Sequence, residues 1–160
     1  PMEYADILER HRLLHGTLSL SGLTVDLHHL RLQTEQEAMG TLLRLRRGVM
    51  VAGTDAARQT DLLRSSYSAL LVIFRAVLRL HGVKPERDAA RVIQDVAAQC
   101  GFDPAPFTAV SALVRGTAFS TGESETVLAG YVRGMDVLVE YLDRFTPPTA
   151  ASAVISPVQS

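Results

Sequence analysis

The sequence has 160 residues, a formal net charge of −1 and 47% hydrophobic residues, which suits a single domain with a substantial core. A near-neutral chain lacks the basic excess of proteins that bind nucleic acids or anionic membrane surfaces, so neither partner is expected. The one cysteine, Cys100, excludes an internal disulfide and suits the reducing cytoplasm. Arg75 and Arg79 interrupt the longest apolar run, so no membrane span is expected.

The first 25 residues differ in character from the rest of the chain. Residues 1–7 alternate like the end of an extended segment, and residues 8–16 can complete a short helix or turn that Gly16 stops. Residues 17–25 are rich in Ser, Thr and Gly, as in a connector. The chain begins with Pro1 rather than methionine. Either an initiator methionine has been removed or the sequence is a piece of a longer chain, in which case residues 1–16 are the remnant of a preceding domain.

Residues 26–51 have the spacing of a long helix. Thr24 or Asp26 can cap its start by accepting hydrogen bonds from the first backbone N–H groups. The glutamates of this segment precede its arginines, an order that matches the helix dipole. Residues 53–55 then predict a short turn whose threonine or aspartate caps the next helix. Because this connection is short, the two helices should lie side by side and antiparallel.

The stretch from Leu62 to Gly82 is the most apolar part of the chain. Its large apolar side chains recur every three or four residues, which places a broad stripe along a helix of five or more turns. Ile73 and Leu80 widen this stripe beyond one face, so the helix should contact at least two others. Gly82 supplies the stop, because glycine readily adopts the left-handed conformation just past a helix end.

Two shorter helical segments follow. Pro85 suits the first position of a third, alanine-rich helix, which Gly101 ends. A short helix is expected over residues 105–115, where an aspartate and a proline precede the first apolar positions.

The last helix is expected from about residue 120 to residue 145. Gly130 and Gly134 lie inside it, and each weakens it by roughly 1 kcal/mol relative to alanine, which indicates close packing against another helix. Residues 146–160 are rich in Pro, Ser and Ala without period and are expected to form a disordered tail. The predicted fold is all-α: an antiparallel bundle of four main helices and one extra short helix over residues 26–145.

Three segments resemble a known helical domain in their order and spacing. They are HLRLQTEQEAMGTLLRLRRGVM, LLRSSYSALLVIFRAVLRLHG and ESETVLAGYVRGMDVLVEYLDRF, the last ending near Asp143. They look like the C-terminal helical domain of bacterial proteins that carry a nucleotidyltransferase-type domain first. That family is related to the HEPN-like or substrate-binding bundles that partner minimal nucleotidyltransferases. The resemblance covers about residues 1–145 and implies that residues 1–16 close the preceding domain.

The motifs that nucleotidyl transfer requires are missing from these 160 residues. The reaction needs a Gly-Ser loop for the phosphates and two carboxylates spaced one residue apart to hold magnesium. Glu123 and Glu125 have this spacing, but at a helix start they suit the positive end of the dipole. Glu3 and Asp6 lie where such folds place a third carboxylate, without the partners that a metal needs. No catalytic residue, metal site or cofactor is therefore expected in this chain.

Arg75 and His81 support a competing hypothesis, that the chain is an enzyme. Their spacing fits the R-x4-6-H pattern of HEPN ribonucleases, in which arginine polarises the RNA phosphate and histidine assists proton transfer. Six residues place the two side chains about 120° apart on an ideal helix. A histidine at a helix C-terminus also interacts with the dipole, and this role is the preferred interpretation. A HEPN-like, metal-independent ribonuclease dimer is the alternative.

Arg44, Arg46 and Arg47 are the candidate substrate-binding residues, since guanidinium groups can bind a phosphate or an acidic partner. The apolar faces of residues 62–80, with the two glycines of the last helix, predict a homodimer. The expected function is that of a non-catalytic accessory or substrate-binding domain of a nucleotidyltransferase-like protein, forming a cleft wall or a dimer interface. A protein–protein interaction module is a further alternative.

Overall fold

The computed structural model describes residues 26–146, and every regular element in this range is a helix. The helices are α2 (Leu27–Ala52), α3 (Ala56–Leu80), α4 (Ala89–Cys100), α5 (Ala105–Val114) and α6 (Glu123–Arg144). The prediction of an all-α chain is confirmed for this range. The expectations for residues 1–25, and for the tail from residue 147 onward, lie outside the described residues.

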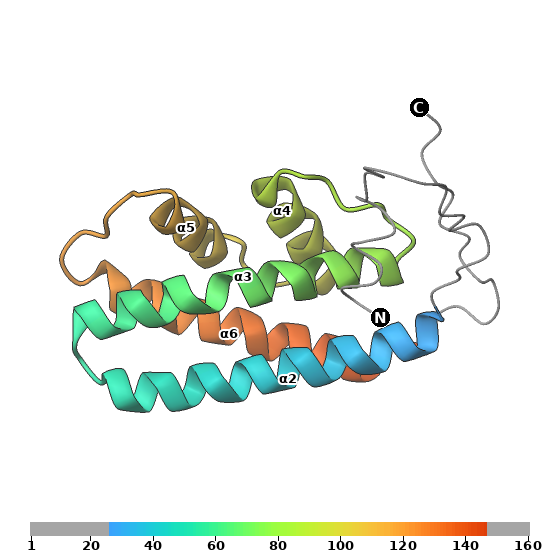
Figure 1. The fold of residues 1–160 in the computed structure, drawn as a ribbon, viewed down its shortest axis with the longest axis horizontal. Helices are drawn as coiled ribbons and strands as arrows, with labels where there is room; N and C mark the ends of the chain where they lie inside the picture. Colours follow the sequence, from blue (N-terminus) through green and yellow to red (C-terminus); the bar gives the residue numbers. More distant parts are fainter. Residues whose placement is uncertain (1–25, 147–160) are drawn as a thin grey trace, which may run out of the picture.

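Three long helices lie side by side, and two short helices cover one side of them (Figure 1). As predicted, α2 and α3 form an antiparallel hairpin, and α6 packs against both. The short helices α4 and α5, of 12 and 10 residues, pack against α3 and α6 and not against α2. The predicted arrangement of four main helices is not confirmed. Gly101, with a φ of 80°, ends α4 where predicted, but α4 begins only at Ala89, so that two short helices occupy the place of one long helix.

Aspartate side chains start three of the helices. Asp26 and Asp55 accept hydrogen bonds from the backbone N–H groups two residues later, at 2.8 and 3.0 Å, so in each case the aspartate of the two predicted candidates is the cap. Asp88 does the same at 3.1 Å, and α4 begins after it, at Ala89. The prediction that Pro85 opens this helix is therefore wrong. The Asp88 carboxylate accepts a hydrogen bond from the free N–H group of Ala90 in the first turn, whereas a proline side chain offers no acceptor.

Phe107 of α5 lies at the centre of an aromatic core between α3, α5 and α6. Its ring centroid is 5.4 Å from that of Phe74, 4.9 Å from that of Phe102 and 4.7 Å from that of Tyr131, and all four side chains are buried. Helix α6 approaches closely here because Gly134 has no side chain to separate its backbone from the Phe107 ring. The close packing predicted for the glycines of the last helix is confirmed, and its partner is α5.

The apolar surfaces predicted to form a dimer interface are used inside the chain. Helix α3 contacts all four other described helices. Leu62, Leu71 and Val72 are half-buried, and its other large apolar side chains are buried, namely Leu63, Leu70, Ile73, Phe74, Val77, Leu78 and Leu80. Gly130 of α6 lies against Pro106 of α5 rather than against a second molecule. Most of the surface predicted for an interface between two copies is therefore already used within the chain.

Candidate functional site: a pocket between α4 and α6

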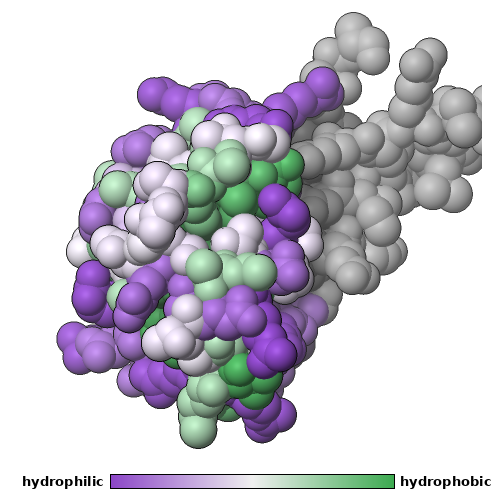
Figure 2. All heavy atoms as spheres, turned by 90° about the vertical axis from the view of Figure 1, so that its left-hand side faces the viewer, coloured by the Kyte–Doolittle hydropathy of each residue, from purple (hydrophilic) through white to green (hydrophobic). Residues whose placement is uncertain are grey.

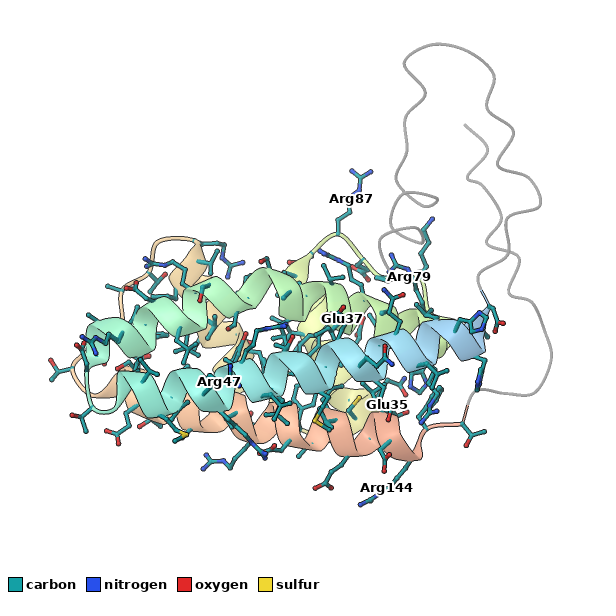
Figure 3. The ribbon with its side chains drawn as sticks, turned by 60° about the horizontal axis from the view of Figure 1, so that its bottom comes forward. Glu35, Glu37, Arg47, Arg79, Arg87 and Arg144 are labelled. Carbon is teal, nitrogen blue, oxygen red and sulfur yellow. The ribbon has the colours of Figure 1, made fainter. Side chains whose placement is uncertain are left out.

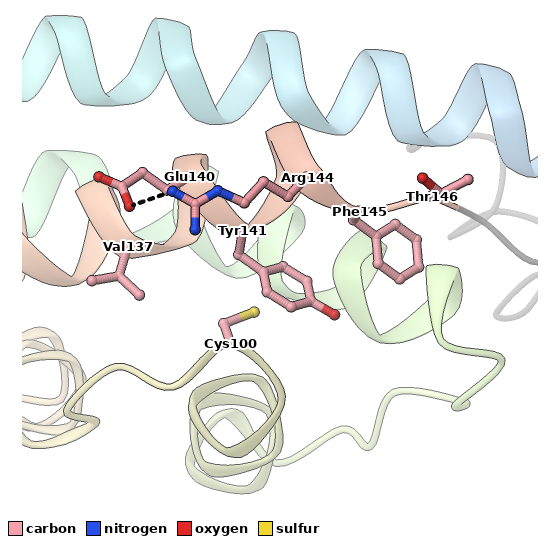
Figure 4. Close-up of a pocket in the computed structure, with 7 residues that line it drawn as sticks. All are labelled: Cys100, Val137, Glu140, Tyr141, Arg144, Phe145 and Thr146. Atoms are coloured by element: carbon pink, nitrogen blue, oxygen red, sulfur yellow. Dashed lines mark ion pairs between the residues drawn. The ribbon is translucent and has the colours of Figure 1, made fainter.

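A pocket opens where the C-terminal ends of α4 and α6 meet (Figure 4). Its volume is about 370 Å³. Cys100, the last residue of α4, forms one side of it. The other side comes from α6 and the two residues after it: Val137, Glu140, Tyr141, Arg144, Phe145 and Thr146. The helical residues recur at spacings of three and four, so they share one face of α6.

The aromatic wall of the pocket continues to the end of α3. The hydroxyl oxygen of Tyr141 lies 2.7 Å from Nε2 of His81, the C-cap residue of α3. The ring of Phe145 stacks on Tyr141 with centroids 5.8 Å apart, and its centroid is 4.9 Å from that of His81. These three residues, the aromatic cluster, join the C-terminal ends of α3 and α6. The tautomer of the imidazole sets the direction of this hydrogen bond: Nε2 accepts from the Tyr141 hydroxyl when the ring proton is on Nδ1, and donates to it when the proton is on Nε2.

The groups that line the pocket suit binding better than nucleophilic chemistry. Burial raises the pKa of the Cys100 thiol to about 12, so the thiol stays protonated and is a poor nucleophile. Burial, and then the nearby Cys100 thiol, raises the pKa of the Tyr141 hydroxyl. Glu140 and Arg144 form an ion pair at 3.6 Å across two largely exposed side chains, where water weakens their attraction. The pocket thus presents the rings of Tyr141 and Phe145, a neutral thiol and a neutral hydroxyl, and an ion pair whose partners can separate in water.

The protein should lose stability on acidification in part through His81. Burial lowers the pKa of this imidazole below its ordinary value of 6.5, so the unfolded chain takes up the proton at a higher pH than the folded chain does. The neutral imidazole therefore contributes to stability above pH 6.5, and this contribution is lost as the pH falls through the lowered pKa of the folded chain. Urea unfolding between about pH 7.5 and about pH 5 should show a declining free energy of unfolding, with a shallower decline in His81→Gln. An equal slope in both proteins would show that other groups carry the effect.

The structure does not bring the three predicted substrate-binding arginines together around one site. Arg46 donates a hydrogen bond to the Asp136 carboxylate of α6 at 2.6 Å. Arg44 donates to the hydroxyl of Thr41, one turn earlier on α2, at 2.9 Å. Arg47 is exposed on α2 (Figure 3). Positions 44 and 46 differ by about 200° around a helix, so their guanidinium groups leave α2 on different faces.

Arg75 and His81 lie on the same helix with different surroundings. Arg75 is half-buried within α3, and His81 lies half-buried at its end. The imidazole of His81 contacts Tyr141 and Phe145 of α6, and its Nε2 shares a hydrogen bond with the tyrosine. This placement gives His81 a role in joining two helices. It offers no specific geometry in favour of the ribonuclease hypothesis.

The pocket residues of α6 were not singled out as site residues in the sequence. Val137, Tyr141 and Phe145 recur every four residues, and this spacing is also typical of a helix face that packs into a core. The spacing does indicate a shared face. It gives no sign that the face passes the end of α4 and stays partly open beside Cys100.

Comparisons with known proteins give no family for this chain. The chain matches no family model, no curated protein and no solved structure. Within residues 26–146, no three His, Cys, Asp or Glu side chains are grouped so that they could hold a metal ion. In the same range, no helix combines the length and the apolar character needed to cross a membrane.

Proposed function

We propose that this chain is a non-catalytic helical accessory domain that binds a small planar ligand in the pocket between α4 and α6. The pocket itself supports the proposal, since its volume of about 370 Å³ lies within the range of small-molecule sites. A planar ring can pack against Tyr141 and Phe145. An anionic group on the ligand can replace Glu140 as the partner of Arg144.

The resemblance to accessory domains of nucleotidyltransferase proteins points to nucleotides as the ligand class, because a nucleotide combines a planar base with anionic phosphates. In this proposal residues 26–145 form a HEPN-like, substrate-binding type of bundle. The bundle supplies one wall of a substrate cleft in the cytoplasm. The catalytic carboxylates belong to a separate or fused nucleotidyltransferase domain.

We further propose that the domain acts as a homodimer. The support comes from exposed apolar side chains that the fold leaves at the surface. Because most of α3 and the glycines of α6 are covered within the chain, we place the interface elsewhere.

Ligand binding should be tested by NMR titration with adenosine, AMP and ATP. We expect saturable shifts in the amide signals of Val137, Tyr141 and Thr146, and the strongest binding for a phosphorylated probe. Val137→Glu should weaken this binding at least tenfold, because it adds a negative charge to the apolar wall of the pocket. Val114→Glu is the matched control, since Val114 on α5 is similarly exposed (44% against 37%) and does not line the pocket. Absence of shifts at millimolar probe, or equal affinity in both variants, would refute the proposal.

A further inference from the structure

Helix α2 is apolar on two sides, and within residues 26–146 the other helices cover only one of them. Its buried side chains, including Leu30, Ala38 and Leu45, face α3 and α6. A second set lies about 150° around the helix from the centre of that buried face. This α2 outer stripe consists of Leu32, Met39, Leu43 and Met50, which are between 40% and 84% exposed.

The α2 outer stripe is a continuous feature rather than scattered exposure. Its spacings of seven, four and seven residues keep the four side chains within about 40° of one another, along about 27 Å of helix. Such a repeat is typical of a seam between two packed helices. Of the eight large apolar side chains exposed in residues 26–146, five lie on α2, the fifth being Val51. Figure 2 shows apolar atoms at the surface on the lower part of the end where α2 meets α3.

The formal charges of α2 are divided along the helix. Residues 27–39 carry one arginine and two glutamates, a formal charge of −1, and residues 40–52 carry three arginines, a charge of +3. Figure 3 labels Glu35 and Arg47 towards opposite ends of α2. Two copies of α2 packed in parallel would place like charges together. An antiparallel pair instead sets the acidic half of each helix against the basic half of the other, and opposes their dipoles.

We propose that the α2 outer stripe binds the same stripe of a second copy of this chain, with the two helices antiparallel. One register pairs Leu32 with Met50 of the second copy and Met39 with Leu43 of the second copy. In that register Glu35 lies at the same height as Arg47 of the second copy. The two lie about 60° from the stripe on opposite flanks, and Arg46 of the second copy is the arginine on the Glu35 flank. The register thus pairs the apolar residues with each other and brings the glutamate of one copy to the arginine-rich half of the other.

Two details of α2 fit this arrangement. Gly40 lies beside the middle of the stripe, where an added Cβ would meet only the Arg44 guanidinium at 3.7 Å, so the glycine leaves room for a close approach. Glu35 already pairs with Arg31 at 3.1 Å within the chain, which holds its carboxylate in place. A single helix pair buries less than the roughly 1,600 Å² of a standard interface, so we expect dissociation in the micromolar range.

Sedimentation equilibrium between about 5 µM and about 500 µM tests the interface. The unmodified chain should pass from monomer to dimer over this range. Leu43→Glu should raise the dissociation constant at least tenfold, because it places a carboxylate from each copy in the centre of the apolar seam. Val114→Glu, a similar change on α5, should leave it unchanged, and circular dichroism should show native helix content in both. A monomer at every concentration, or equal dissociation constants for both variants, would overturn the proposal.

Disulfide trapping tests the orientation. Met39→Cys and Leu43→Cys chains are mixed and oxidised, with the unmodified chain as the background for its buried Cys100. The antiparallel register predicts mixed dimers containing one chain of each kind. Dimers of Met39→Cys with itself, and of Leu43→Cys with itself, would indicate a parallel pair and would overturn the register. This inference rests on the proposed homodimer and is independent of the pocket, since Leu43→Glu should leave nucleotide binding intact.

Discussion

Replacing Phe107 with alanine should lower the free energy of unfolding by about 3–5 kcal/mol. Its ring is fully buried and lies 4.7 to 5.4 Å, centroid to centroid, from three other aromatic rings on α3, on α6 and in the connection between α4 and α5. Three parts of the fold would therefore face the same cavity, and none can close it without separating from another neighbour. Urea denaturation followed by circular dichroism gives the difference in free energy.

Phe119→Ala is the matched control, because Phe119 is only partly buried at the edge of the core, between α5 and α6. Water can enter the space that this side chain leaves, so the loss should be about 1–2 kcal/mol. A loss for Phe107→Ala no greater than that for Phe119→Ala would show that α5 is not held to the core through this ring.

Gly134→Ala should destabilise the protein by about 1–2 kcal/mol, although alanine is the better helix former. An added Cβ would lie 2.6 Å from Cζ of Phe107 and nearer still to its Cε2, closer than carbon atoms pack in proteins. The ring cannot retreat because Phe74 and Tyr131 hold its other sides. The cost of separating α5 from α6 should therefore exceed the gain of about 1 kcal/mol in helix propensity. Thermal and urea unfolding measure the net effect.

The same substitution at Gly40 should have the opposite sign. Gly40 also lies within a helix, but an added Cβ there meets only one flexible guanidinium at 3.7 Å. Gly40→Ala should therefore stabilise the monomer by up to about 1 kcal/mol, measured at a protein concentration too low for self-association. If both alanine variants were stabilising, the close approach of α5 and α6 at Gly134 would be disproved.

Most helix boundaries could be predicted because they depend on neighbouring residues. Asp26 and Asp55 were recognisable as caps, and Gly101 as a stop, since each acts on backbone groups within a few residues of itself. The start of α4 was misplaced at Pro85 because two local patterns compete there. Asp88 provides the stronger one, as its carboxylate satisfies a backbone N–H group directly.

The candidate pocket could not be predicted in the same way. Cys100 and Tyr141 are far apart in the sequence, and His81 is further still from Tyr141, so only the packing of α3, α4 and α6 brings them together. Each of these residues also suits a purely structural role at a helix end or on an apolar face. Their meeting at a partly open surface is a property of the folded chain alone.

Local sequence patterns were enough to predict the helical class, most of the helix ends and many of the buried side chains, because spacing and capping act over one or two turns. What covers each apolar face depends on how the helices pack, which local patterns do not reveal. The stripe of α3 and the glycines of α6, which suggested an interface between two molecules, are covered by α4, α5 and the other long helices. The outer stripe of α2 is left exposed. Periodicity shows that a face needs a partner, and the physical choice among partners depends on contacts between residues distant in the chain.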